Sequence, residues 1–234
     1  MKKIIIVFTF LLLLLYGLWE LHKSRNYQVF GQLVSSFDTQ ELVIALTFDD
    51  GPSALYTDSV LAILREHGVK ATFFVTGSET DTNLTFAKKI VEDGHELGNH
   101  SYSHFRMVLK SPKTIRNEIE RTDLAIRSAG YNGPINFRPP FGKKLFLLPW
   151  YLSKHDRTTI MWDLEPESYS EIAISSDKIV SYVIENVKPG SILLLHVMYA
   201  SGEESRKALP LIIDQLQKIG YQFKTVSELL NKNL

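Results

Sequence analysis

The chain has 234 residues, and its 26 lysines and arginines balance 26 aspartates and glutamates, so the formal net charge is zero. This length is sufficient for one domain with a sizeable core. Nucleic acid is not an expected partner, because its phosphates select a positively charged surface. The absence of cysteine excludes disulfides, thiolate metal sites and a cysteine nucleophile, so any metal must bind to histidine, aspartate or glutamate.

The first 22 residues have the charge and apolar pattern of an export or membrane segment. Two lysines follow Met1, and residues 4–19 form an uninterrupted apolar run. Residues 18–22 are too bulky for a small-x-small cleavage site, so we expect an uncleaved membrane anchor over residues 1–22, with a cleaved signal as the alternative. Residues 23–40 are predicted to be a polar tether, and residues 41–234 a folded domain.

After the tether, short apolar runs alternate with amphipathic stretches. The apolar runs predict buried strands of a parallel sheet at residues 42–48, 71–75, 159–162 and 192–195, with weaker candidates at 96–99, 135–138 and 221–226. The amphipathic stretches predict helices over residues 53–67, 83–93, 111–129, 176–187 and 203–219. This alternation predicts an α/β fold, most simply a barrel of parallel strands surrounded by helices.

Clusters of polar residues follow five of the predicted strands. They are Asp49-Asp50-Gly51-Pro52, His100-Ser101-Tyr102-Ser103-His104, Arg138-Pro139-Pro140-Phe141-Gly142, Asp163-Leu164-Glu165-Pro166-Glu167, and His196. The carboxyl ends of parallel strands meet at one mouth of a barrel, so we expect these clusters to form one site.

Two of the clusters contain residue pairs that suit metal chemistry. Adjacent aspartates diverge, so one of Asp49 and Asp50 can bind a cation while the other takes part in proton transfer; a simple turn is the alternative. His100 and His104, four residues apart, can share one divalent metal with a carboxylate. The alternative for these histidines is a pair of solvated loop residues.

Two further side chains have less specific patterns. His196 ends the most apolar strand, where a buried structural histidine is the ordinary interpretation, but its place at the mouth favours a general acid. Arg138 precedes two prolines, which stiffen the backbone and can hold a guanidinium against a carboxylate. A surface arginine beside a turn is the alternative.

Together these motifs resemble those of the polysaccharide deacetylase family, also called the NodB-homology or family 4 carbohydrate esterase domain. The resemblance covers about residues 42–230 and depends on Thr47-Phe48-Asp49-Asp50-Gly51-Pro52, His100-Ser101-Tyr102-Ser103-His104, Arg138-Pro139-Pro140-Phe141-Gly142 and Leu194-Leu195-His196. It implies a distorted, seven-stranded (β/α) barrel that binds a divalent metal, usually Zn²⁺ and sometimes Co²⁺ or another ion.

The resemblance also implies roles for individual residues. Asp50, His100 and His104 would hold the metal. Asp49 would be the general base for the attacking water, and Arg138 would orient the Asp49 carboxylate.

The same resemblance implies the remaining roles in the reaction. His196 would protonate the departing sugar amine. The backbone N–H of Phe141, next to Pro140, would stabilise the oxyanion, and Leu194 would line a pocket for the acetate methyl group.

One family motif, commonly Asp-x-x-Asp-Trp, aligns with Glu165-Pro166-Glu167-Ser168-Tyr169. Glu165 would stand for the carboxylate that tunes the catalytic histidine. Tyr169 would stand for the tryptophan that lines the sugar groove. These departures leave the identity of the sugar polymer open.

The resemblance therefore implies an enzyme, a hydrolase that removes acetyl groups from N-acetylglucosamine units of peptidoglycan or chitin-like oligosaccharides. O-deacetylation by the same site and a non-catalytic carbohydrate-binding role are the alternatives. We expect a monomer with one span in the cell membrane and with the deacetylase domain, residues 41–234, outside the cytoplasm. If the signal is cleaved, the domain is secreted.

Overall fold

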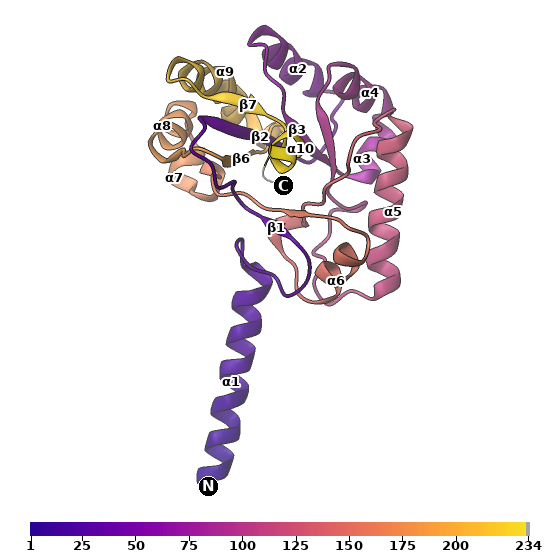
Figure 1. Cartoon of the computed structure of the whole chain (residues 1–234), viewed down its shortest axis with the longest axis vertical. Coiled ribbons are helices and arrows are strands. Elements are labelled where there is room, and N and C mark those ends of the chain that lie inside the picture. Colours follow the sequence, from indigo (N-terminus) through magenta and orange to yellow (C-terminus); the bar gives the residue numbers. More distant parts are fainter. Residues whose placement is uncertain (233–234) are drawn as a thin grey trace.

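The computed structural model describes residues 1–232, which form a long N-terminal helix joined to an α/β domain (Figure 1). The helices are α1 (Lys2–Lys23), α2 (Thr57–Glu66), α3 (Gly77–Thr82), α4 (Leu84–Glu92), α5 (Pro112–Ser128), α6 (Leu147–Lys154), α7 (Ser170–Ala173), α8 (Ser176–Asn186), α9 (Glu203–Lys218) and α10 (Val226–Lys232). The strands are β1 (Leu33–Val34), β2 (Val43–Asp49), β3 (Thr72–Val75), β4 (Glu96–Asn99), β5 (Thr159–Ile160), β6 (Ser191–Leu195) and β7 (Gln222–Lys224).

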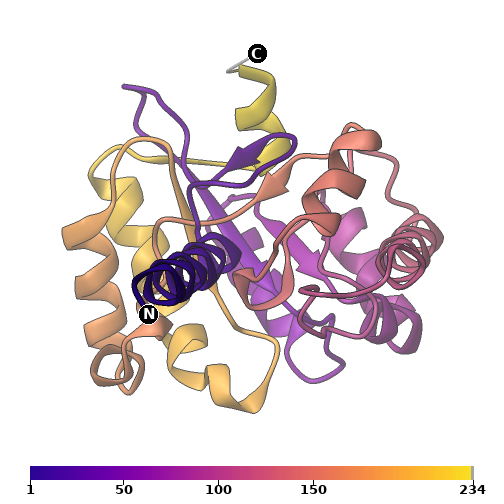
Figure 2. The same ribbon diagram turned by 90° about the horizontal axis from the view of Figure 1, so that it is seen from below.

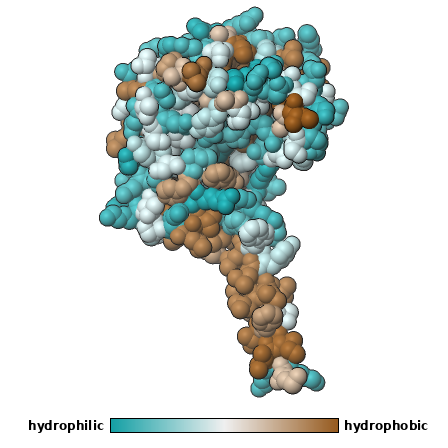
Figure 3. Space-filling model, turned by 180° about the vertical axis from the view of Figure 1, so that it is seen from behind, coloured by the Kyte–Doolittle hydropathy of each residue, from teal (hydrophilic) through white to brown (hydrophobic). Residues whose placement is uncertain are grey.

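The N-terminal helix α1 projects away from the domain and has no buried residue (Figure 1). Its 22 residues span about 33 Å, which matches the hydrocarbon thickness of a bilayer. Its mean hydropathy reaches 2.4, and Figure 3 shows apolar side chains along most of its visible face. The helix is therefore long and apolar enough to cross a membrane.

The centre of the domain is a parallel sheet with the strand order β4-β3-β2-β6, and β7 pairs with the first half of β2. All seven residues of β2 are buried, because the strand is covered on both faces. On one face, Leu46 and Phe48 pack with Leu61 of α2 and Leu209 of α9. On the other face, Ala45 belongs to a second cluster that contains residues of β5 and α10. A fully buried apolar side chain of this kind stabilises a fold by about 1.5–3 kcal/mol.

The strands provide an α/β fold with a parallel sheet, as predicted, but a closed seven-stranded barrel is not confirmed. Strand β5 pairs only with β1, and in the described part of the chain isolated bridges connect this pair to the main sheet. The expected strand at residues 135–138 is reduced to bridges of Phe137 with Asn99 and Thr159. Prolines at positions 134, 139 and 140 have no N–H to donate, so a longer ladder cannot form there.

The segment between α1 and β2 is not a detached tether. Leu33 pairs with Thr159 through β1, and the backbone N–H of Phe37 donates to the Gly190 carbonyl at 2.8 Å. Phe37 is buried, with the partly buried Leu33 and Val34 packed against its cluster. These apolar side chains anchor the segment to the domain. They were not recognised in the sequence, because the segment as a whole is polar.

Five predicted helices correspond to α2, α4, α5, α8 and α9, with their ends displaced by a few residues. The shorter helices α3, α6, α7 and α10 were not predicted, because one or two turns give too little periodicity.

Candidate active site

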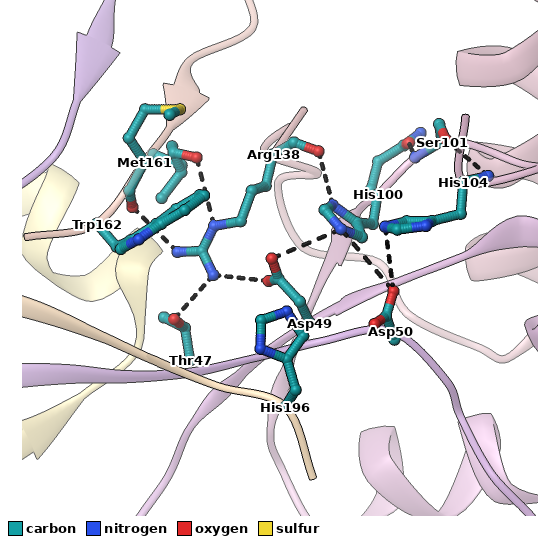
Figure 4. A network of polar contacts seen from close by, with 12 residues as sticks. Thr47, Asp49, Asp50, His100, Ser101, His104, Arg138, Met161, Trp162 and His196 are labelled. Carbon is teal, nitrogen blue, oxygen red and sulfur yellow. Dashed lines mark hydrogen bonds and ion pairs between the residues drawn. The ribbon is translucent and has the colours of Figure 1, made fainter. Parts of the chain in front are cut away.

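The parallel strands bring the predicted polar clusters together at their carboxyl ends. Asp49 ends β2, His100 follows the last residue of β4, and His196 follows β6. Arg138 follows Phe137, which bridges to Asn99 in β4. Figure 4 shows these side chains converging from separate elements.

Three of these side chains, Asp49, His100 and His196, border a cavity of about 640 Å³, which is large enough for a sugar unit. Its lining comprises Lys23, Arg25, Asp49, Asp50, His100, His104, Phe141, Gly142, Lys143, Trp162, Glu165, Ser168, Leu194 and His196.

Asp50, His100 and His104 form a cluster that suits a metal ion, with their ligand atoms within 4.8 Å of one another. Asp50 Oδ1 lies 3.3 Å from His104 Nε2 and 3.9 Å from His100 Nε2. This carboxylate oxygen is buried and accepts no hydrogen bond from the described residues, as expected for an atom that faces a cation site. Two imidazole nitrogens and one carboxylate oxygen are a common donor set for zinc.

Hydrogen bonding and burial prepare His100 to be a ligand. Its Nδ1 lies 2.8 Å from the Arg138 carbonyl oxygen, which can only accept, so Nδ1 carries the hydrogen and Nε2 has a free lone pair. Burial lowers the pKa of His100 to about 4, which keeps the imidazole neutral. Burial and the neighbouring Asp49 raise the pKa of Asp50 to about 7, because both disfavour a negative charge on this carboxyl. A divalent cation bound beside Asp50 would stabilise that charge and lower the pKa again.

The backbone at this cluster adopts left-handed conformations in residues other than glycine. The φ angles of Asp50, Ser101 and His104 are 74°, 65° and 52°. Such a conformation costs about 1–3 kcal/mol and persists where surrounding contacts enforce it. Here the Asp50 N–H donates to the Phe74 carbonyl at 3.0 Å, and the Ser101 N–H donates to Asn99 Oδ1 at 2.9 Å.

Asp49 is held as an ionised carboxylate by a fully buried arginine. Arg138 Nη1 donates to Asp49 Oδ1 at 2.7 Å and to Thr47 Oγ1 at 2.8 Å, while Nη2 donates to the Met161 carbonyl at 3.1 Å. Burial alone would raise the pKa of Asp49. The neighbouring positive charges, of which the Arg138 guanidinium has the largest effect, outweigh burial and lower the pKa of this carboxyl. The other Asp49 oxygen, Oδ2, lies 3.5 Å from His100 Nε2, so the carboxylate stands beside the metal cluster.

The carboxylate that holds His196 is Glu167, and the prediction that Glu165 does so is wrong. Glu167 accepts from His196 Nδ1 at 2.5 Å and from the His196 backbone N–H at 2.9 Å. Burial lowers the pKa of His196, but Glu167 outweighs burial and raises it to about 9. Glu165 instead accepts from Arg25 Nη2 at 2.6 Å and from Trp162 Nε1 at 2.8 Å. The single turn of 3₁₀ helix at Pro166–Ser168 directs the two glutamates to these different neighbours.

Comparison with known proteins agrees with this geometry. A family model described as polysaccharide deacetylase matches residues 37–160. The chain belongs to the polysaccharide deacetylase family. It is 33% identical over 202 residues to a peptidoglycan-N-acetylglucosamine deacetylase of Bacillus cereus, covering 86% of this chain and 93% of that one. It is 32% identical to a chitooligosaccharide deacetylase of a Bradyrhizobium species, covering 80% and 90%.

A solved structure supports the same assignment. The Bc1960 peptidoglycan N-acetylglucosamine deacetylase superposes with a TM-score of 0.79 at 32% identity, covering 84% of this chain and 92% of that one. The expectation of an enzyme with deacetylase relatives is thereby confirmed.

The expected substrate-contacting residues of this polysaccharide deacetylase divide into two groups. Leu194 lines the cavity, as does Phe141, whose ring centre is 4.7 Å from that of His104. Pro140 is buried and does not border the cavity, and Tyr169 packs its ring on Tyr182 at 5.3 Å instead. The tryptophan in the cavity lining is Trp162, which stands before the motif rather than at its end.

Sequence reasoning missed several residues of the site. Thr47 and Glu167 lie within the quoted motifs, so the sequence could have indicated that they belong to the site. It did not indicate which side chains they bond to. Lys143 directly follows the motif that begins at Arg138. Lys23 and Arg25 gave no signal, because they lie far from every motif in the sequence and reach the cavity only through the fold.

Proposed function

We propose that this polysaccharide deacetylase hydrolyses the acetamide of N-acetylglucosamine units in peptidoglycan or a related N-acetylated glycan and releases acetate. The observation that carries the proposal is the cavity itself. It places a histidine–carboxylate cluster of metal-binding type beside an ionised Asp49 and a histidine whose pKa is raised.

Asp50, His100 and His104 would hold a divalent ion, with Zn²⁺ the ion best suited to this donor set and Co²⁺ an alternative. The unsatisfied Asp50 Oδ1 supports the fit. When bound, such an ion supplies Lewis-acid polarisation of a carbonyl and lowers the pKa of water.

The proposed base is Asp49. It takes a proton from the attacking water, and its ionisation is maintained by Arg138 at 2.7 Å. Arg138 is itself fixed by Thr47 and the Met161 carbonyl, so the carboxylate has one orientation. The backbone N–H of Phe141 would donate to the oxygen that becomes negative.

The proposed acid is His196, which gives its proton to the sugar nitrogen as the C–N bond breaks. An amine is a poor leaving group until it is protonated. Glu167 keeps His196 protonated, so the site is better suited to hydrolysis of an amide than of an ester. Glu167 occupies Nδ1, which leaves Nε2 as the nitrogen available for the substrate. The buried Leu194 would contact the acetate methyl group.

We further propose that α1 is retained as a single-span membrane anchor, with the domain outside the cytoplasm. The helix is largely apolar and has no buried residue, and its last residue, Lys23, lines the cavity together with Arg25. Cleavage after the last residue of this helix, Lys23, would remove a part of the cavity lining. A substrate in the cell envelope agrees with this location.

The test is acetate release by the purified full-length protein in detergent with Zn²⁺, with Asp49→Asn as the inactive control. Peptidoglycan, chitooligosaccharides and acetylxylan are compared. We expect acetate from at least one of the two N-acetylated substrates and less from acetylxylan. Acetate from acetylxylan alone would replace the proposal by O-deacetylation, and no acetate from any substrate would favour a non-catalytic role.

A further inference from the structure

Three basic side chains border the cavity that contains the proposed catalytic residues. Lys23 and Arg25 come from the end of α1 and the residues after it, and Lys143 follows the Pro140–Gly142 turn. None of the three belongs to the metal cluster or to the Asp49 and His196 pairs. Figure 2, seen from below, shows α1 foreshortened in front of the domain and inside its outline.

The two basic residues near α1 are held in position. The Lys144 backbone N–H donates to the His22 carbonyl at 3.0 Å, and the Lys144 ammonium donates to the Ser24 carbonyl. Arg25 donates to Glu165 at 2.6 Å, and its guanidinium carbon lies 4.8 Å from the centre of the Trp162 ring. The end of the membrane helix is thus built into the wall of the cavity.

The charges on this wall do not balance. Lys23 pairs with Glu20 at 2.9 Å, and Arg25 pairs with Glu165. Lys143 has no acidic partner among residues 1–232, and it faces other cations instead. Burial first, and then Arg106, Lys23 and Arg25, lower the pKa of Lys143. A negative group placed beside Lys143 would relieve this repulsion.

We propose that Lys143, together with Lys23 and Arg25, forms a subsite for an anionic oxygen group carried by the glycan substrate. This proposal rests on the proposed deacetylase function and makes it more specific: the enzyme prefers a negatively charged glycan to a neutral chitooligosaccharide. On an envelope glycan the anion is a carboxylate of an attached peptide or acid substituent, or a phosphate of an attached polymer. Both would be recognised by the same cations.

The experiment compares N-acetylated glycans with different anionic groups, using the full-length protein in detergent with Zn²⁺. The substrates are a glycan peptide with free carboxylates, the same molecule with its carboxylates amidated, and a phosphorylated oligosaccharide. The variants are Lys143→Gln and Lys143→Glu. Lys113→Gln is the matched control, because Lys113 is an exposed lysine of α5 that does not line the cavity.

We expect Lys143→Gln to lower kcat/KM about fivefold for the anionic substrate relative to the amidated one, the upper range for one partly exposed ion pair. The reversed charge in Lys143→Glu should lower that ratio further, and Lys113→Gln should not change it. Raised salt should increase KM for the anionic substrate, because it screens the attraction. A response to the phosphorylated substrate alone would identify phosphate as the source of the anion.

An equal loss on charged and amidated substrates would overturn the subsite, because Lys143 would then only support the structure. An unchanged ratio in both Lys143 variants would overturn it as well. Failure of the wild-type protein to release acetate from any N-acetylated substrate would instead count against the proposed function. The binding of the carboxylated glycan to Asp49→Asn, measured by calorimetry with and without Lys143→Gln, tests the subsite independently of turnover.

Discussion

Glu167→Gln should move the alkaline limb of the pH–activity profile to lower pH. The proposed acid, His196, must be protonated, and its pKa of about 9 keeps it so through neutral pH. Glutamine retains the shape of Glu167 and can still accept from the His196 backbone N–H, but it removes the negative charge. Burial, which opposes the charged imidazole, is then offset only by the weaker attraction of Asp49 and Asp50, and we expect the pKa to fall to about its ordinary value of 6.5.

The size of the effect follows from the fraction of protonated His196. At pH 8 this fraction falls from about 0.9 to about 0.03, so kcat should fall about thirtyfold. At pH 6 the same change should cost less than about twofold. The loss is therefore concentrated on the alkaline side.

The assay is acetate release from an N-acetylglucosamine oligosaccharide between pH 5.5 and 9.5, with metal content measured for every variant. Glu165→Gln is the matched control, because Glu165 bonds to Arg25 and Trp162 and not to His196. Its alkaline limb should stay in place. An unmoved limb in Glu167→Gln, or a moved one in Glu165→Gln, would refute the assignment of Glu167.

Three further substitutions test the other parts of the site. Asp49→Asn should retain the metal by elemental analysis yet lose turnover, whereas near-normal activity would mean that the base lies elsewhere. His196→Ala should slow hydrolysis of N-acetylated oligosaccharides by about 10²–10⁴-fold but affect an activated aryl acetate far less, and equal losses on both would refute the acid role. Arg138→Met should destabilise the fold by about 3–5 kcal/mol in denaturant unfolding, because it leaves the buried Asp49 charge without its partner. In the same variant the pKa of Asp49 rises, so the acid limb of activity should move to higher pH, and an unmoved limb with unchanged stability would contradict the pairing.

The extent to which sequence predicted the fold depended on how strong the local patterns were. Strands such as β2 and β6 are continuous apolar runs, and helices such as α5 and α9 have several turns of clear periodicity, so they were predicted. The packing of Leu33 and Phe37 was not, because few apolar residues in a polar segment do not reveal a long-range partner. Closure of the barrel was expected from the alternation of strands and helices and from the family, and it is reduced to isolated bridges where prolines surround Phe137.

For the site, sequence predicted which residues gather but not every pairing. Asp50, His100 and His104 converge because each follows a parallel strand, and their spacing within the motifs was informative. The choice between Glu165 and Glu167 depends on a single 3₁₀ turn, which composition cannot resolve. Lys143 depends on neighbours that only the fold assembles, so its surroundings could not be predicted.

The most direct test of the central claim is acetate release from an N-acetylglucosamine oligosaccharide before metal removal, after chelation, and after return of one equivalent of Zn²⁺. We predict that release stops on chelation and returns in the wild type. The variant His104→Ala loses one of the three proposed ligands. One equivalent of Zn²⁺ should therefore neither remain bound to it nor restore its acetate release. Undiminished release by the chelated protein, or stoichiometric Zn²⁺ retained by His104→Ala, would contradict a metal-dependent deacetylase centred on Asp50, His100 and His104.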